Sequence, residues 1–424
     1  MKLKLFDYDL PKELIAQTPA VPRDRSRLLV YNHVGRSFPD RRNFPGHHSI
    51  CDGGNEGGNE GRAKTKKIVH DRFYNLPKYL TNNDVLVFNN TKVFPARLLG
   101  NKLSGGKAEV LLLKKIERDG RQAGRLVDRS FNEGRSSKCE GWESMVGCTR
   151  PKAGLKLRFA HGLQAEVINQ LSEKTWLIKF NFKGDKFNAI LNQIGQTPLP
   201  PYIASKNQEN KKSKQQNSKI QNQYQTVYAK TVGSAAAPTA GLHFTKNLLN
   251  KIKKQGCEIE FVTLHVGLGT FNPVNTENIE NYKIHSEWAS VDKATIKRLI
   301  NAKRKGKRII AVGTTSTRVL ETVFNSATLL RSIEATKETS TGTSMIRSMA
   351  VKDFNNNIST FIYPGYKFNF VDAMITNFHL PRSSLLMLVS AFIGRTNAMK
   401  IYQTAIKMKY RFFSFGDAML LTKK

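Results

Sequence analysis

The stretch "KRIIAVGTTSTRVLETVF" (residues 307–324) decides the fold class. Its first part, "RIIAV", is a short apolar run of the kind that forms a strand buried on both faces of a sheet. Gly313 ends this run, and the hydroxyl residues of 314–317 follow as the expected start of a helix. A strand that leads directly into a helix is the building unit of an α/β sheet.

The rest of the C-terminal half repeats this alternation. Thr245 fits the N-cap of one helix, and Gly256 fits its stop signal. The alternation predicts a largely parallel sheet covered by helices on both faces. We expect helices at residues 245–256, 293–306, 315–324, 382–394 and 397–410, and strands at 257–267, 307–313 and 371–378.

Residues 84–182 have a different pattern, with short apolar or alternating runs broken by turns such as Gly105-Gly106. Several short strands at this spacing predict a small barrel or sandwich. The expected strands are 84–90, 96–100, 107–115, 155–159, 164–170 and 174–182.

Four segments look like insertions between these elements: 31–70, 115–141, 204–223 and 326–353. Three of them are rich in Gly, Asn, Gln, Lys, Ser or Thr and poor in large apolar residues, so we expect flexible loops. The segment 115–141 is mixed, with short apolar pieces.

The charge of the chain is strongly positive, with 68 Lys and Arg against 33 Asp and Glu and a net charge of +35. The four segments carry only +10 of it, so about 25 positive charges belong to the part expected to fold. This balance indicates a polyanionic partner. A proteome that generally favours lysine is the alternative explanation.

Other features narrow the class of protein. No run of 18 apolar residues or signal peptide is found, and we expect a cytoplasmic protein. The four cysteines are scattered, and the spacings typical of metal ligands are missing, so we expect reduced thiols and no metal.

Three strand ends carry residues suited to chemistry: His265 before "VGLGTFNP", Gly313 before Thr314, and Asn377 before Phe378 and His379. In α/β sheets, sites gather beyond the carboxyl ends of the strands, and helix starts bind anions. The alternatives are a simple helix cap, buried core histidines, and in "GLGTF" an incomplete nucleotide loop.

A fourth stretch, "AAAPTAGLHF" (residues 235–244), fits neither helical nor strand periodicity. Its small residues would allow the chain to pass close to a ligand, and they end in His243.

Taken together, these motifs resemble the S-adenosylmethionine:tRNA ribosyltransferase-isomerases of queuosine biosynthesis. The resemblance runs from Met1 to Leu421, interrupted by the insert-like segments. The pieces that carry it are "FDYDLPKELIAQTPAVPRDRSRLLV", "DVLVFNNTKVFPARL", "GGKAEVLLL", "LPLPPYI", "YQTVYAKTVGSAAAPTAGLHFT", "TLHVGLGTFNPV", "IHSEW", "AVGTTSTRVLE", "FIYPGYKF" and "MITNFHLPRSSLLMLVSAFIG".

The resemblance implies an α/β fold, with a three-layer αβα domain at 1–83 and 196–424 and a smaller β-barrel domain at 84–195. It implies transfer of the ribosyl part of S-adenosylmethionine to 7-aminomethyl-7-deazaguanine in a tRNA with a GUN-type anticodon. The product is epoxyqueuosine, and adenine and methionine are released. S-adenosylmethionine is then a consumed substrate, no cofactor or metal is expected, and the enzyme is expected to be a monomer.

The resemblance also suggests site residues. Histidine suits proton transfer near neutral pH, so the catalytic candidates are His243, His265 and His379. The candidates for binding S-adenosylmethionine are Thr239, Gly241, Gly267, Gly269, Thr270, Thr314, Thr315, Thr317 and Arg318. The candidates for binding the tRNA or its base are Arg23, Arg97 and Tyr228.

The chain departs from the family at Asn90-Thr91-Lys92, where Asp-Thr-Arg is usual, and lysine lacks the planar fork of arginine. Two other functions remain open at this point: a non-catalytic RNA-binding protein and an S-adenosylmethionine-dependent methyltransferase. The broken glycine loop speaks against the methyltransferase.

Overall fold

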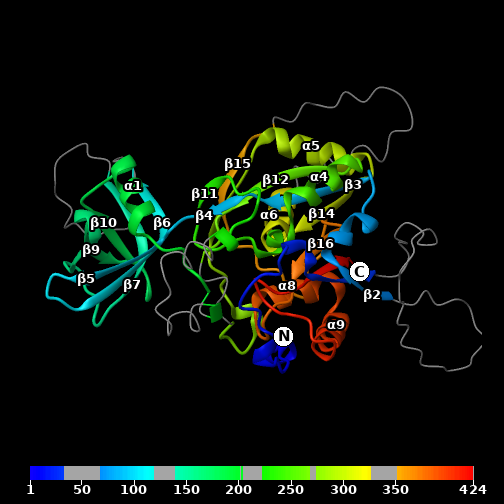
Figure 1. Ribbon diagram of the computed structural model, residues 1–424, viewed down its shortest axis with the longest axis horizontal. Helices are drawn as coiled ribbons and strands as arrows, with labels where there is room; N and C mark the ends of the chain where they lie inside the picture. Colours follow the sequence, from blue (N-terminus) through cyan, green and yellow to red (C-terminus); the bar gives the residue numbers. More distant parts are fainter. Residues whose placement is uncertain are drawn as a thin grey trace, which may run out of the picture. The chain divides into compact units, whose positions relative to one another are not determined.

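The structure, a computed structural model, describes residues 1–32, 67–118, 139–200, 202–203, 222–267, 274–325 and 351–423. The chain forms two compact units, which Figure 1 colours along the sequence. The larger unit consists of Met1–Thr91, Tyr202–Thr231 and Ala237–Lys424, and the smaller of Lys92–Pro201 and Val232–Ala236. The expected insertions fall largely outside the described residues.

The larger unit is built on a nine-stranded sheet with the order β15-β13-β12-β3-β14-β16-β17-β1-β2. Its strands are β1 (Arg27–Asn32), β2 (Lys67–Arg72), β3 (Asp84–Asn89), β12 (Glu258–Leu264), β13 (Glu287–Val291), β14 (Arg308–Val312), β15 (Phe354–Ile358), β16 (Ala373–Asn377) and β17 (Ala418–Thr422).

The centre of this sheet is parallel, because β12, β3, β14 and β16 are consecutive parallel neighbours. β1 also runs parallel to β17, whereas β13, β15, β2 and the β16–β17 pair are antiparallel. The prediction of a largely parallel sheet is therefore correct for the four strands β12, β3, β14 and β16, whereas the strands that flank them make the sheet mixed. Strands such as β15, with the sequence "FNNNI", have too few apolar residues to be recognised as strands from the sequence pattern.

The α-helices of the larger unit are α4 (Lys246–Lys254), α5 (Lys293–Arg304), α6 (Thr314–Phe324), α8 (Ser384–Ile393) and α9 (Arg395–Lys407). The expected cap of α4 is confirmed, because the Thr245 hydroxyl oxygen accepts a hydrogen bond from the Leu248 N–H at 3.1 Å. Short 3₁₀ helices are η1 (Leu3–Phe6), η2 (Lys12–Leu14), η3 (Arg23–Arg25), η5 (Phe73–Tyr79), η7 (Thr239–His243) and η9 (Ile279–Asn281).

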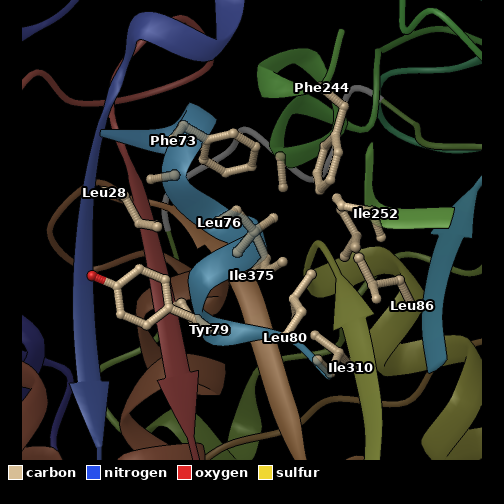
Figure 2. Close-up of a cluster of buried hydrophobic side chains, with 14 of the residues drawn as sticks. Leu28, Phe73, Leu76, Tyr79, Leu80, Leu86, Phe244, Ile252, Ile310 and Ile375 are labelled. Carbon is tan, nitrogen blue, oxygen red and sulfur yellow. The ribbon is translucent and has the colours of Figure 1, made fainter. Parts of the chain in front are cut away.

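Both faces of the sheet are buried. On one face, alternate strand residues such as Leu86, Ile310 and Ile375 pack with Phe244 and Ile252 in a single apolar cluster (Figure 2). On the same strands, the intervening residues, among them Val85, Val87, Ile309, Ala311 and Met374, are equally buried. Because side chains alternate between the faces of a strand, burial of both sets requires a layer on each side of the sheet. The α/β class with a three-layer αβα unit is confirmed.

The smaller unit is a closed barrel with the order β10-β7-β6-β5-β8-β9, and the expected barrel is confirmed. Its elements are β5 (Arg97–Lys102), β6 (Lys107–Arg118), β7 (Cys139–Gly147), β8 (Lys156–Arg158), β9 (Gln164–Gln170), β10 (Trp176–Phe180) and α1 (Gly184–Ile194). Phe187, Ile190 and Leu191 of α1 join the apolar cluster of the barrel strands. The sequence pattern predicted neither α1 nor β7.

One predicted boundary is wrong. Residues 84–89 were expected to open the barrel domain, but they form β3, which lies between β12 and β14 in the large sheet. The smaller unit begins at Lys92 instead. An apolar run such as "DVLVF" could form a strand of the barrel or a strand of the large sheet. Only its pairing partners, which are distant in sequence, distinguish the two. The short strands β4 (Thr91–Val93) and β11 (Thr231–Ser234) pair with each other.

Candidate active site

The carboxyl ends of the central strands meet along one edge of the large sheet, where edge means the border formed by the strand ends and not an outermost strand. Parallel pairing places Asn89 opposite Val262, and Val312 opposite both Phe88 and Ile375. The residues that end or follow these strands therefore lie along the same edge. They include His265, Gly313 and Asn377. The sequence-based expectation that these strand ends belong to one region agrees with this pairing.

His265 follows β12 and is held by two neighbours. Its Nδ1 lies 2.8 Å from the Thr91 hydroxyl, and its ring stacks on Trp288 with centroids 4.9 Å apart. The Thr91 hydroxyl donates to the carbonyl of Thr231, so it accepts from the Nδ1–H of His265. Nε2 then carries the lone pair, and it has no hydrogen-bond partner among the residues that the structure describes.

His243 ends η7, and both of its ring nitrogens are engaged. Nδ1 lies 2.7 Å from the Ser26 hydroxyl, and Nε2 lies 3.0 Å from the amide nitrogen of Asn377. That amide nitrogen also donates to the carbonyl of Phe413, which fixes the orientation of the amide. Nε2 of His243 is therefore an acceptor, and Nδ1–H is the donor to Ser26.

His379 follows β16 and is enclosed by tyrosines. Its Nε2 lies 3.0 Å from the Thr376 hydroxyl, and its backbone N–H donates to the hydroxyl of Tyr402. The hydroxyl of Tyr8 donates to its carbonyl. This histidine is 7% exposed and contributes to the packing behind the strand end.

Burial determines the charge of all three histidines. It lowers the pKa of His265 to about 4. It lowers the pKa of His379 to about 3. For His243 burial, together with the charges of Arg411 and Arg23, lowers the pKa to about 3. All three imidazoles are therefore neutral near pH 7.

The start of α6 presents backbone N–H groups at the same edge. Its N-cap is Gly313, which has a φ of 94° and no side chain to cap the helix. The hydroxyls of Ser316 and Thr317 donate back to the carbonyls of Val312 and Gly313, so they are used within the helix. The Thr315 hydroxyl accepts a hydrogen bond of 3.3 Å from Asn89. A helix start without a side-chain cap attracts an anion.

Arg318, one turn into α6, is buried at 3% exposure. Its Nη1 pairs with Glu287, whose other carboxylate oxygen accepts a 2.8 Å hydrogen bond from the Gly267 N–H. Nε donates to the carbonyl of Thr360. Nη2 is buried without a hydrogen-bond partner in the described part of the chain. Glu287 thus ties Arg318 to the segment that directly follows His265.

The stretch 235–244 is packed against Tyr228. A Cβ added to Gly241 would lie 1.8 Å from the Tyr228 hydroxyl oxygen, so no larger residue fits there. The Thr239 hydroxyl donates to the Asn377 side-chain oxygen at 3.2 Å. The small residues of this stretch therefore allow close packing between η7, Tyr228 and the end of β16.

The remaining candidates have separate surroundings. The guanidinium of Arg23 donates to the carbonyls of Asn222, Gln223 and Gln225. Arg97 lies in the barrel unit and forms a two-pronged ion pair with Glu109. Gly269 and Thr270 lie outside the described residues.

Several residues of this region were not site candidates from sequence: Asn89, Thr91, Glu287 and Trp288. Glu287 and Trp288 stand within "IHSEW", and Thr91 within "NNTKV", so the motifs were visible. Their roles were not visible, because each residue acts through a partner far away in the sequence. The Asn89 amide, for example, donates to the carbonyl of Leu264 and accepts from the Leu264 N–H.

Among the residues that the structure describes, no cluster of His, Cys, Asp or Glu could hold a metal ion. No helix in the same ranges is long and apolar enough to cross a membrane.

The sequence matches the family described as "Queuosine biosynthesis protein" over residues 3–46 and 61–421, and the chain belongs to this family. It is 43% identical to the S-adenosylmethionine:tRNA ribosyltransferase-isomerase of Carboxydothermus hydrogenoformans, over 99% of this chain and 100% of that protein. The protein of the same name from Clostridioides difficile is 42% identical, with the same coverage.

A solved structure is also similar: the S-adenosylmethionine tRNA ribosyltransferase of Thermotoga maritima. It is 31% identical and aligns with a TM-score of 0.45 over 98% of this chain and 99% of that one.

The contact between Gly241 and Tyr228 gives a stability test. Gly241→Ala should lower the free energy of unfolding by about 1–3 kcal/mol, because the new methyl group overlaps the Tyr228 hydroxyl. Adding Tyr228→Phe should restore part of the loss, as measured by thermal unfolding in a double-mutant cycle. Gly106→Ala, where only Lys102 Cδ lies near at 3.8 Å, is the control. A melting temperature of Gly241→Ala equal to that of the control would contradict this packing.

Proposed function

We propose that this chain transfers the ribosyl moiety of S-adenosylmethionine to the 7-aminomethyl-7-deazaguanine base of a tRNA, giving epoxyqueuosine, adenine and methionine. The observation that carries this proposal is the 43% identity to a ribosyltransferase-isomerase over nearly the full length of both chains. The net charge of +35 suits a polyanionic substrate.

The finer parts of the proposal concern the partners. The tRNA has a GUN-type anticodon, S-adenosylmethionine is consumed as a substrate, and no metal or redox cofactor takes part. The enzyme works in the cytoplasm as a monomer.

Among the three histidines, we assign proton transfer to His265. Its geometry supports this choice, because Nδ1–H is held by Thr91 while Nε2 keeps an uncommitted lone pair. The lowered pKa of about 4 keeps Nε2 unprotonated near pH 7, as a base requires. His243, with both ring nitrogens engaged, and His379, whose Nε2 is engaged by Thr376, are assigned to positioning the ends of η7 and β16.

One histidine can serve both proton transfers. As a base, Nε2 of His265 takes the proton from the carbon next to the sulfonium. The resulting imidazolium has a low pKa and is therefore a strong acid, which passes the same proton to the departing adenine. The aminomethyl nitrogen of the base then attacks the sugar carbon that adenine has left and loses a proton to solvent. Methionine leaves as its C–S bond breaks and the sugar atoms close to the epoxycyclopentanediol of the product.

Arg318 and the first turn of α6 suit the carboxylate of the methionine part. The buried Nη2 of Arg318 offers a donor, and Thr314 and Thr315 stand at the uncapped helix start. Thr317 contributes through its hydrogen bond to Gly313 and shapes this turn.

The other candidates keep proposed roles. Gly267, Gly269 and Thr270 allow backbone to approach the nucleoside, and Thr239 and Gly241 keep η7 close to the strand ends. Arg97 is a proposed contact to the tRNA. Arg23 and Tyr228, which are engaged within the fold, shape the pocket wall.

The reaction itself is the first test. Incubation of the purified chain with S-adenosylmethionine and tRNA that carries the aminomethyl base should release adenine and methionine in equal amounts, measured by liquid chromatography and mass spectrometry. Formation of S-adenosylhomocysteine would instead indicate a methyltransferase. Binding of tRNA without turnover would indicate a non-catalytic RNA-binding protein.

The role of His265 is tested by kinetics. His265→Ala should lower kcat at least ~100-fold, because general acid–base groups contribute about 10²–10⁴. In the wild type, kcat/KM should stay level as pH falls to about 5 and then decline, because protonation near the lowered pKa of about 4 removes the base. His161→Ala, an exposed histidine of the barrel unit, is the control. A decline of kcat/KM centred near pH 6.5, or a folded His265→Ala variant with normal kcat, would exclude this role.

A further inference from the structure

A groove outside the strand-end site is lined by Pro22, Asp24, Arg25, Arg72 and Tyr74 and has a volume of about 520 Å³. We call it the Tyr74 groove. Its size is that of a small-molecule or nucleotide site. Arg25 and Arg72 are exposed, and Tyr74 is 47% exposed.

The groove lies on the same sheet edge as the candidate active site. β17 is antiparallel to β16 and parallel to β1, so Arg27 at the start of β1 is at the edge that carries Asn377. β2 pairs antiparallel with β1, with Arg72 opposite Arg27. Three strand steps of about 4.8 Å separate β16 from β2, so the groove is roughly 14 Å along the sheet from Asn377.

The walls of the groove are joined to His243 by their neighbours in sequence. Ser26, next to Arg25, bonds to Nδ1 of His243. Phe73, between Arg72 and Tyr74, packs on the same imidazole with ring centroids 5.0 Å apart. The groove is thus a rigid extension of the region around η7 rather than an isolated surface feature.

The charges of the groove favour an anion. Arg72 donates one hydrogen bond of 3.1 Å to the carbonyl of Arg25, which holds its guanidinium over the groove. Neither arginine forms an ion pair within the described ranges. The acidic residue of the groove, Asp24, already accepts a 2.8 Å hydrogen bond from the Thr245 hydroxyl. Two guanidinium groups beside an open aromatic face match a phosphate next to an unstacked base.

We propose that the Tyr74 groove binds one unpaired nucleotide of the RNA substrate, with its base stacked on Tyr74 and its phosphate held by Arg25 and Arg72. This inference rests on the proposed function. A single-stranded loop is favoured over a duplex or an acidic protein, because only an unstacked base can use the face of the Tyr74 ring. The groove then anchors the loop while a second nucleotide reaches the strand-end site.

The test is equilibrium binding of an anticodon stem-loop RNA, followed by fluorescence anisotropy at several salt concentrations. Arg25→Gln/Arg72→Gln should weaken binding at least ~10-fold and reduce the slope of log K against log salt by about 0.7, because one phosphate contact to a single strand contributes about that much. Tyr74→Ala should weaken binding about 10-fold, and Tyr74→Phe, which keeps the ring, should not. The affinity for S-adenosylmethionine should stay unchanged.

Lys254→Gln/Lys305→Gln is the matched control. Both lysines are exposed; Lys254 ends α4 and Lys305 follows α5, and the chain leads from them into the starts of β12 and β14, at the opposite ends of the strands from the groove. An equal loss in this control, or groove variants that bind like wild type, would overturn the proposal. An equal loss of affinity for a plain RNA duplex would also overturn it, because a duplex offers no base to Tyr74. Failure of the proposed function is distinguishable, because the wild type would then release no adenine from S-adenosylmethionine and tRNA.

Discussion

The parallel hydrogen bonding of β12, β3, β14 and β16 is the constraint on which the site depends. It forces four chain segments that are up to about 290 residues apart in sequence to end at one edge of the sheet. The residues that follow those strands are neighbours for this reason alone. The side chains buried on both faces of these strands hold the edge in place, because a shift of one residue would turn each buried set toward the wrong layer.

Polar side chains at this edge hold one another in defined orientations. The Asn377 amide joins Thr239, His243 and Phe413, and the Asn89 amide joins Leu264, Thr91 and Thr315. Such buried groups are costly when unpaired and rigid when paired. Nε2 of His265 has no hydrogen-bond partner within the described chain, and Nη2 of Arg318 is buried there without one. Rigid surroundings with a few unsatisfied groups are what a binding site requires.

Much of this arrangement could be predicted from the sequence where the signal is local. The cap at Thr245, the strand–helix unit at 308–324 and the short barrel strands follow from patterns within a few residues. The assignment of β3 failed because an apolar strand gives no sign of its partners. The strands β13, β15 and β17, each of which pairs antiparallel with a neighbour, were not predicted either; β15, for example, has too few apolar residues to show a strand pattern.

The candidate site shows the same division. The three histidines could be identified as candidates from the sequence, but the difference in how their ring nitrogens are hydrogen-bonded could not. His243 and His265 both follow or end apolar stretches, and only contacts with Asn377, Ser26 and Thr91 separate an engaged imidazole from an open one. The Glu287 bridge between Arg318 and Gly267 joins three separate motifs, and no spacing rule connects them.

We propose that His265 presents an unprotonated Nε2 to the substrate while His243 and His379 hold the fold. Imidazole ¹⁵N NMR of the full chain near pH 7, with and without S-adenosylmethionine, tests it most directly. We expect three neutral imidazoles, with Nδ1–H in His265 and His243, and a ligand-dependent shift at Nε2 of His265 alone. A shift at Nε2 of His243 or His379 with His265 unmoved, or a protonated His265 in the free enzyme, would contradict it.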